Sequence, residues 1–152
     1  MAKVNNFTNA GSISLTSGGP SVGDTIYSVT IDGVVLDGNS NHPNHLKGGA
    51  GNDVLIGGSS HDTLIGAAGD DVLTGSAGAD IFQFGSGSGH DVVTDFGAGD
   101  SLKMADVRHG VGVKLVDTGA DTIIQLSTGD SVTLIGVHLS DLAPTSSGYV
   151  HA

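Results

Sequence analysis

The sequence predicts an all-β fold whose middle part is a parallel solenoid of two sheets. Gly supplies 26 of the 152 residues, and all 16 acidic residues are Asp, so that the good helix former Glu is absent. Both features disfavour helices. The third observation is a nine-residue repeat between Gly48 and Gln83. Its period is too long for a helical turn, and it indicates stacked structural units.

The length and the charge of the chain exclude several classes of protein. A chain of 152 residues fits one domain. Five Lys and Arg against a net charge of −11 provide no basic patch for nucleic acid. No apolar run approaches the roughly 18 residues that cross a bilayer as a helix. The absence of Cys excludes disulfide frameworks and thiolate zinc sites. We therefore expect no nucleic-acid partner and no membrane span.

The first part of the chain, residues 1–41, predicts a β-hairpin cap. Apolar and polar residues alternate in Ile13–Thr16 and again in Tyr27–Ile31. Asp32-Gly33 separates the second run from Val34–Leu36. This dipeptide favours a two-residue hairpin turn, since both of its positions tolerate positive φ.

The middle part, residues 42–103, carries the repeat in a constant register. Asp recurs every nine residues, with a large apolar residue two positions later and Gly five positions earlier. The four clear acids are Asp53, Asp62, Asp71 and Asp80. Degenerate units extend the pattern to Asn44 upstream and, after the inserted Phe84-Gly85, to Asp91 and Asp100 downstream.

Nine residues in this pattern suit a short strand followed by a turn of about six residues. Two such units make one coil of strand, turn, strand and turn, and the coils stack. The central residue of each strand points into the seam between the two sheets. The residues expected there are Leu46, Leu55, Leu64, Leu73, Phe82, Val93 and Leu102.

One buried apolar side chain per nine residues is too little to offset the entropy lost on ordering the backbone. Ca²⁺ supplies the missing stabilisation, because it accepts six to eight oxygens from carboxylates and carbonyls. Turns on the same side of the solenoid are two repeats apart in the chain. We therefore expect calcium to be shared by these pairs: Asn44 with Asp62, Asp53 with Asp71, Asp62 with Asp80, and Asp71 with Asp91. The alternative is that the Asp residues only form turns and bind no ion.

The pattern Gly-Gly-x-Gly-x-Asp-x-(large apolar)-x resembles the RTX, or haemolysin-type, calcium-binding repeat. Val92–Leu102 is similar to the segment that closes such repeats in serralysin-type proteases and alginate epimerases. The resemblance implies a parallel β-roll, with calcium held by Asp side chains and by carbonyls at the Gly positions. It also implies type I secretion from a Gram-negative bacterium and folding in extracellular calcium.

The metal ligands expected from the register and the resemblance form one set. They are Asn44, Gly49, Gly51, Asp53, Gly58, Ser60, Asp62, Gly69, Asp71, Gly78, Asp80, Gly87, Gly89, Asp91, Asp95 and Asp100. Ser60 stands where the pattern has Gly, so a positive φ would be strained there. We expect the neighbouring Asp70 to be a solvated acid, and His61 and His90 to be exposed.

The last part, residues 104–152, predicts an antiparallel cap. Val111–Leu115, Thr122–Leu126 and Ser131–Ile135 have strand character and are separated by Gly-Asp or Gly-Ala-Asp turns. The tail from Ala143 to Gly148 is rich in Ser and Pro, and we expect it to be frayed.

No catalytic motif is present in the sequence, and we expect a non-catalytic module of a larger secreted or cell-surface protein. A polysaccharide-binding module is the alternative, with Lys103, Arg108 and Lys114 as the cations that would meet an acidic polymer. A surface or biofilm element in which calcium links chains is a further one. The outward apolar residues Val54, Ile56, Val72 and Ile81 are expected to lie under the flanking β parts, or else to form a partner face.

Overall fold

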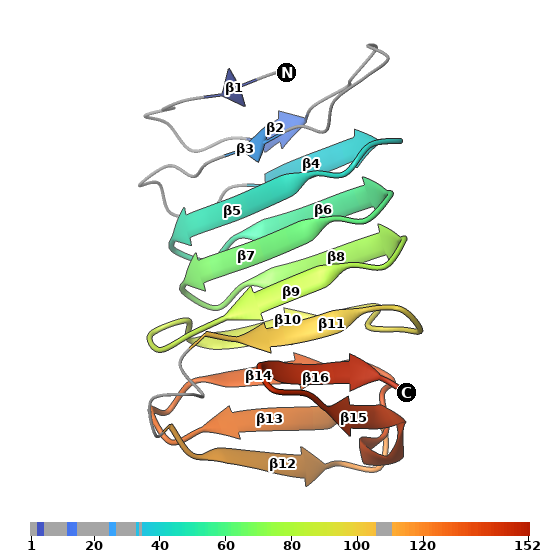
Figure 1. Cartoon of the computed structure of the whole chain (residues 1–152). Coiled ribbons are helices and arrows are strands. Elements are labelled where there is room, and N and C mark those ends of the chain that lie inside the picture. Colours follow the sequence, from blue (N-terminus) through green and yellow to red (C-terminus); the bar gives the residue numbers. More distant parts are fainter. Residues whose placement is uncertain (1–2, 5–11, 15–24, 27–32, 34, 106–110) are drawn as a thin grey trace.

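The part of the chain that the structure describes forms two stacked β-sheets of eight strands each (Figure 1). The computed structural model describes residues 3–4, 12–14, 25–26, 33, 35–105 and 111–152. Within these ranges the only helical element is the short 3₁₀ turn η2 (Leu139–Asp141), and no helix is long and apolar enough to cross a bilayer. The predicted all-β fold is confirmed.

The strands alternate between the two sheets along the roll. Sheet A contains, in spatial order, β1 (Lys3–Val4), β3 (Thr25–Ile26), β5 (His45–Ala50), β7 (Thr63–Ala68), β9 (Ile81–Phe84), β11 (Ser101–Met104), β16 (Gly148–His151) and β15 (Leu142–Pro144). Sheet B contains β2 (Ser12–Ser14), β4 (Val35–Ser40), β6 (Val54–Ser59), β8 (Val72–Ala77), β10 (His90–Val93), β14 (Ser131–Leu134), β13 (Thr122–Leu126) and β12 (Val113–Asp117).

Each coil of the roll consists of two nonapeptides, as predicted. Leu46 on β5 is in register with Leu64 on β7, and both strands run parallel. Leu55 and Leu73 are related in the same way in sheet B. The insertion at Phe84-Gly85 widens one turn, so that Leu73 pairs with Val93 at a separation of 20 residues.

The core is the seam between the sheets. All seven expected apolar residues are buried there, with exposed fractions of 0–1%. The C-terminal strands continue the same core with Ile124, Leu126, Val132 and Leu134. Strand period places alternate side chains inward, so one continuous apolar layer runs through the roll and its C-terminal cap.

The N-terminal strands extend the parallel roll. The strand β4 was the expected second arm of a hairpin, but it pairs in parallel with β2 and β6. The expected first arm, Tyr27–Ile31, lies outside the described residues, as do Leu15 and Thr16. Gly33 has the positive φ of +76° that a turn at this point requires. The boundary at residue 41 stays a prediction.

The C-terminal cap is antiparallel, as predicted, and is joined to the roll. The strands β12, β13 and β14 pair antiparallel, while β14 pairs in parallel with β10 and so prolongs sheet B. The expectation of a frayed tail was wrong. The strands β15 and β16 form a hairpin, and β16 pairs antiparallel with β11. Tyr149 packs against the core and anchors this hairpin.

The flanking strands lie beside the roll and not over its faces (Figure 1). Val54, Ile56 and Ile81 are partly exposed and Val72 is exposed, so the described flanking strands do not bury them as the preferred interpretation expected. Val72 is 36% exposed. The caps pair with the edge strands of the roll. They satisfy backbone N–H and C=O groups that an edge strand would otherwise leave unpaired.

Candidate metal centre

The repeated acids form a column along one side of the roll, where the turns after β4, β6, β8 and β10 are stacked. The backbone N–H of Asn44 donates to Oδ1 of Asp62 at 2.7 Å, and that of Asp62 donates to Oδ1 of Asp80 at 2.7 Å. The N–H of Asp80 then donates to Oδ1 of Asp100 at 2.8 Å. Each carboxylate thus joins its own coil to the preceding one.

A second column stands on the opposite side, in the turns after β5, β7 and β9. The N–H of Asp53 donates to Oδ1 of Asp71 at 2.8 Å, and that of Asp71 donates to Oδ1 of Asp91 at 3.0 Å. All four predicted pairs are therefore neighbours in space. The widened turn after β9 leaves the last pair in contact.

In three of these carboxylates the second oxygen has no hydrogen-bond partner in the protein. The Oδ2 atoms of Asp62, Asp71 and Asp91 are buried and accept no hydrogen bond. A buried, unpartnered carboxylate oxygen is unfavourable unless a proton or a cation neutralises it. The arrangement therefore provides buried hard oxygen atoms that are available to a cation.

Burial changes the proton affinity of the same carboxylates. Loss of solvent around Asp62 raises its pKa to about 6, although a hydrogen bond from Asn44 acts against this. Burial raises the pKa of Asp91 to about 7, against a lowering effect of the N–H of Asp71. The pKa values of Asp71 and Asp80 are raised for the same main reason.

The first Gly of each unit makes room for the carboxylate. A Cβ at Gly57 would lie 2.6 Å from Oδ2 of Asp62 and 2.7 Å from the carbonyl oxygen of Gly75. A Cβ at Gly48, Gly66 or Gly75 would meet its own acid in the same way. None of these four Gly residues has a positive φ. Gly is required at these positions because the carboxylate and the neighbouring coil approach its Cα closely, and not because the backbone adopts an unusual conformation.

Most of the predicted carbonyl donors lie in the turns beside the two columns, while Gly49 and Gly58 lie near the ends of β5 and β6. The carbonyl oxygens of Gly51, Ser60 and Gly69 would clash with a Cβ on Gly69, Gly78 and Gly89, the residues in the same place one coil later. Gly49, Gly58 and Gly87 have φ values of +123°, +114° and +80°. Gly78 and Gly89 have positive φ as well. These positions can present backbone oxygens to the stacked turns, but their role as ligands stays a prediction.

The strained backbone conformation expected at Ser60 occurs at two other residues. Ser60 does not have a positive φ, whereas Ala67 and Ser76 do, at 89° and 73°. These two residues replace the second Gly of their units, at the position where Gly49 and Gly58 also have positive φ. The second position is therefore the one that demands the left-handed conformation in every clear unit.

Three of the predicted ligands are the least suited to hold a cation. Asn44 donates from Nδ2 to Oδ1 of Asp62 at 2.9 Å, so its amide already bonds the carboxylate below it. Asp95 accepts the N–H groups of Gly75 and Ser76 with its two oxygens. Asp100 accepts from Asp80 and Gly97, which uses both of its oxygens.

A third set of bonds runs along the outer rim, in the opposite direction. Oδ1 of Asn52 accepts the N–H of Asp70 at 2.9 Å, and Oδ1 of Asp70 accepts the N–H of His90 at 2.8 Å. Nδ1 of His61 accepts the N–H of Ala79 at 2.9 Å. His61 and His90 are exposed, as expected. Asp70 is not merely solvated, because it connects two coils.

The sequence interpretation missed Asp130. This nearly buried carboxylate accepts the N–H groups of Gly87 and Gly89 at 3.0 Å and the hydroxyl of Thr128. Burial alone would raise the pKa of Asp130, but these hydrogen bonds lower it. No repeat period connects residues 41 and 43 positions apart, so the sequence held no signal for this contact.

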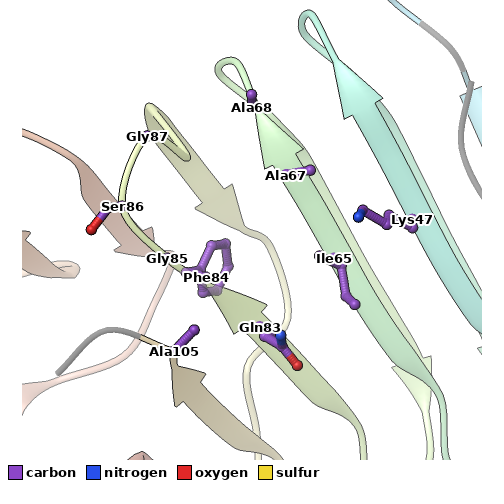
Figure 2. A pocket seen from close by; sticks show the side chains of 10 residues that line it. All are labelled: Lys47, Ile65, Ala67, Ala68, Gln83, Phe84, Gly85, Ser86, Gly87 and Ala105. Atoms are coloured by element: carbon purple, nitrogen blue, oxygen red, sulfur yellow. The ribbon is translucent and has the colours of Figure 1, made fainter. Parts of the chain in front are cut away.

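The cations proposed for an acidic polymer are not gathered in one place. Lys103 points outward from sheet A and Lys114 outward from sheet B, since each is exposed between inward-facing neighbours. Arg108 lies outside the described residues. Lys103 instead shares an outward row with Gln83, Ile65 and Lys47, which follow one another in register across β11, β9, β7 and β5. A shallow hollow of about 310 Å³ adjoins this row, bounded also by Phe84 and Ala105 (Figure 2).

Comparison with known families decides the nature of the columns. The profile of the RTX calcium-binding nonapeptide repeat matches the chain in four copies, over residues 40–73 and 56–93. Residues 40–93 are RTX repeats. These repeats bind Ca²⁺, and the chain contains a calcium-binding β-roll, as predicted. The RTX repeat is a calcium-binding motif and not a catalytic one.

A similar fold is found in a solved structure. The chain is similar to the crystal structure of the extracellular lipase LipA from Serratia marcescens, at 23% sequence identity and a TM-score of 0.52. The match covers 84% of this chain and 19% of the lipase, so this chain corresponds to about a fifth of that protein. The likeness concerns the fold alone. No curated protein matches the chain.

The chemistry of the RTX columns fits Ca²⁺. The available donors are carboxylate and carbonyl oxygens, which are the ligands that this hard cation prefers. Among the described residues no three His, Cys, Asp or Glu side chains converge on one point. The acids of each column are spread over stacked coils, so backbone carbonyls must complete any coordination shell. Asp53, Asp62, Asp71, Asp80 and Asp91 are the side chains that would hold the ions.

Proposed function

We propose that this RTX roll is a module that stays unfolded at low calcium and folds when it meets extracellular Ca²⁺. The observation that carries the proposal is the set of buried Oδ2 atoms without partners on Asp62, Asp71 and Asp91. At neutral pH the burial of these oxygens without a partner lowers the stability of the folded state when no cation is bound. Bound Ca²⁺ neutralises them and stabilises the stacked turns by mass action.

Export belongs to the same proposal. We infer that the module is part of a larger protein of a Gram-negative bacterium that leaves the cell by type I secretion and acts outside it. The support is the RTX repeat itself together with the likeness in fold to part of an extracellular lipase. An export route that carries unfolded chains requires that cytoplasmic calcium is too low for folding.

A calcium titration followed by circular dichroism tests the folding proposal. We expect coil in chelator, a β spectrum with Ca²⁺, and little change with Mg²⁺, which demands a strict octahedron and dehydrates reluctantly. The midpoint is expected at about 10⁻⁴ to 10⁻³ M, the range of extracellular calcium modules. A fully folded roll in chelator would contradict the folding role, and a midpoint below about 10⁻⁶ M would contradict folding only after export.

Binding of an acidic polysaccharide is a second candidate, supported by the outward row that contains Lys47 and Lys103. The two Lys residues are three strands apart, or about 14 Å at 4.8 Å per strand, and the hollow beside them contains apolar and amide groups. Titration with a carboxylated oligosaccharide at fixed calcium tests this candidate. Lys47→Ala and Lys103→Ala should weaken binding, while Lys114→Ala on the other sheet should not. Equal effects of all three would indicate charge attraction without a site.

A further inference from the structure

Ser88 is buried in the widened turn after β9, whereas the same place in every clear repeat is exposed. Ser88 lies three residues before Asp91, and its exposed fraction is 3%. The residues three positions before the acids of the clear units are all exposed, and they are Ala50, Ser59, Ala68 and Ala77. The inserted Phe84-Gly85 distinguishes this turn from the others, so the inward position of Ser88 follows from the longer loop.

The hydroxyl of Ser88 has no hydrogen-bond partner in the protein, and neither has Oδ2 of Asp91. Both side chains are buried, with exposed fractions of 3% and 1%. Burial raises the pKa of Asp91, and the hydroxyl of Ser88 is among the groups that act against this rise, so the two side chains lie close together. Two buried oxygen atoms without partners in one turn are unfavourable unless a further group binds them.

The backbone on both sides of Ser88 is held by the C-terminal cap. Oδ2 of Asp130 accepts the N–H of Gly87, and its Oδ1 accepts the N–H of Gly89, both at 3.0 Å. On the side of the preceding coil, the carbonyl of Ser88 accepts the N–H of Gly69 at 3.2 Å. The position of Ser88 in the roll is therefore set from both sides.

We propose that Oγ of Ser88 and Oδ2 of Asp91 together bind one Ca²⁺ ion, with backbone carbonyls and water as its remaining ligands. The carboxylate provides the charge, and the hydroxyl provides a neutral oxygen with free lone pairs, as water does. Ca²⁺ accepts six to eight such oxygens in a flexible geometry.

This ion would differ from the others of the columns, because a second type of side chain joins the acids as a ligand. The equivalent residues of the clear units are exposed and so cannot do the same. The proposal rests on the binding of Ca²⁺ by the columns, and it does not depend on how the protein is exported.

Terbium luminescence tests the proposal, with Tb³⁺ in place of Ca²⁺ in the fully loaded chain. Decay rates in H₂O and in D₂O give the number of water molecules on the bound ions. In Ser88→Ala a water molecule should replace the hydroxyl, so this number should rise by about one per chain. Ser88→Cys keeps the size of the side chain, but a thiol is a poor ligand for a hard cation, so the same rise is expected.

Ser59→Ala is the matched control. Ser59 occupies the same place in its unit as Ser88, but it is exposed and its hydroxyl donates to Asn41. The control should leave the hydration of the ions unchanged. Equilibrium dialysis against Ca²⁺ measures the affinity in parallel. Ser88→Ala should require about tenfold more calcium to fill one ion, the lower end of the losses found around metal sites, and Ser59→Ala should not.

Two results would overturn the proposal. The first is a match of both Ser88 variants to the wild-type chain in hydration and in affinity, which would leave calcium-induced folding of the roll untouched. The second is a loss of affinity without a gain of water, which would mean that Ser88 packs in the turn without binding the ion. A wild-type chain that binds no Ca²⁺ would contradict calcium-dependent folding and this site together.

Discussion

The backbone N–H of Asp62 donates to Oδ1 of Asp80 at 2.7 Å across two coils of the roll, while Oδ1 of Asp62 accepts the N–H of Asn44 at the same distance. Asp71 and Asp80 are bonded on both sides in the same way. Removal of one carboxylate disconnects a coil from the preceding one and also takes away a ligand of the cation. Asp70, the acid of the rim, makes a single side-chain bond and should matter less.

Asp71→Ala should raise the calcium concentration for half-folding at least about tenfold, or 1.4 kcal/mol. Asp71 is fully buried, bonds Asp53, and would hold calcium through Oδ2. Asp70→Ala loses only the exposed bond to His90, which is worth about 1 kcal/mol. A calcium titration of both variants by circular dichroism measures the difference. If the two variants shifted the midpoint equally, the register assigned to the metal ligands would be wrong.

Without calcium, the roll should be more folded at mildly acidic pH than at alkaline pH. The pKa values of Asp62 and Asp91 are raised in the folded state to about 6 and about 7 from an ordinary value of 3.8. The folded state therefore binds protons more tightly, and this stabilisation is greatest below 3.8 and is lost as the pH rises through 6 to 7. Circular dichroism in calcium-free buffer should show more β structure at about pH 4.5 than at pH 8.

The double variant Asp62→Asn, Asp91→Asn is the control for this pH dependence. It removes the two carboxylates with the largest upward pKa shifts and should reduce the change between pH 4.5 and pH 8, while Asp71 and Asp80, whose pKa values are also raised, keep a smaller part of it. Saturating Ca²⁺ should reverse the trend in the wild-type chain, because protons then compete with the cation for the same oxygens. A calcium-free roll that gained structure as the pH rose would show that these carboxylates are not what opposes folding.

The roll could be predicted from the sequence because its contacts repeat with the chain. A period of nine places Leu46 above Leu64 and Asp53 above Asp71 without any knowledge of the rest of the fold. The buried residues of the seam and the four acid pairs follow from the nine-residue period alone. Even the insertion at Phe84-Gly85 changes only one separation, from 18 to 20 residues.

The caps and the surface could not be predicted in this way, because their contacts have no period. The bond from Gly87 to Asp130 joins segments 43 residues apart, and the pairing of β16 with β11 joins the tail to the roll. The sequence also placed Lys103 and Lys114 together, although they belong to opposite sheets. Proximity along the chain says little about which sheet a strand will join once the periodic part has ended.

Gly57→Ala should destabilise the calcium-bound roll by about 1–3 kcal/mol, the usual effect of overpacking. The new methyl group would lie 2.6 Å from Oδ2 of Asp62 and 2.7 Å from a backbone carbonyl, so it displaces a ligand and separates two coils. Gly97→Ala is the matched control, since the nearest atom to its Cβ is 3.6 Å away and its φ is not positive. Thermal unfolding at fixed calcium measures both, and equal losses would refute the steric explanation.

Ala67→Gly and Ser76→Gly should each stabilise the roll by about 0.5–1 kcal/mol. Both residues have positive φ, which penalises a side chain by about 1–2 kcal/mol, and Gly removes that penalty while increasing the entropy of the unfolded chain. Ala68→Gly, at the next residue and without positive φ, should instead destabilise by up to about 1 kcal/mol. Denaturant unfolding at fixed calcium compares the three variants. Loss of stability in Ala67→Gly equal to that in Ala68→Gly would mean that the turns do not adopt the left-handed conformation at the second position of the repeat.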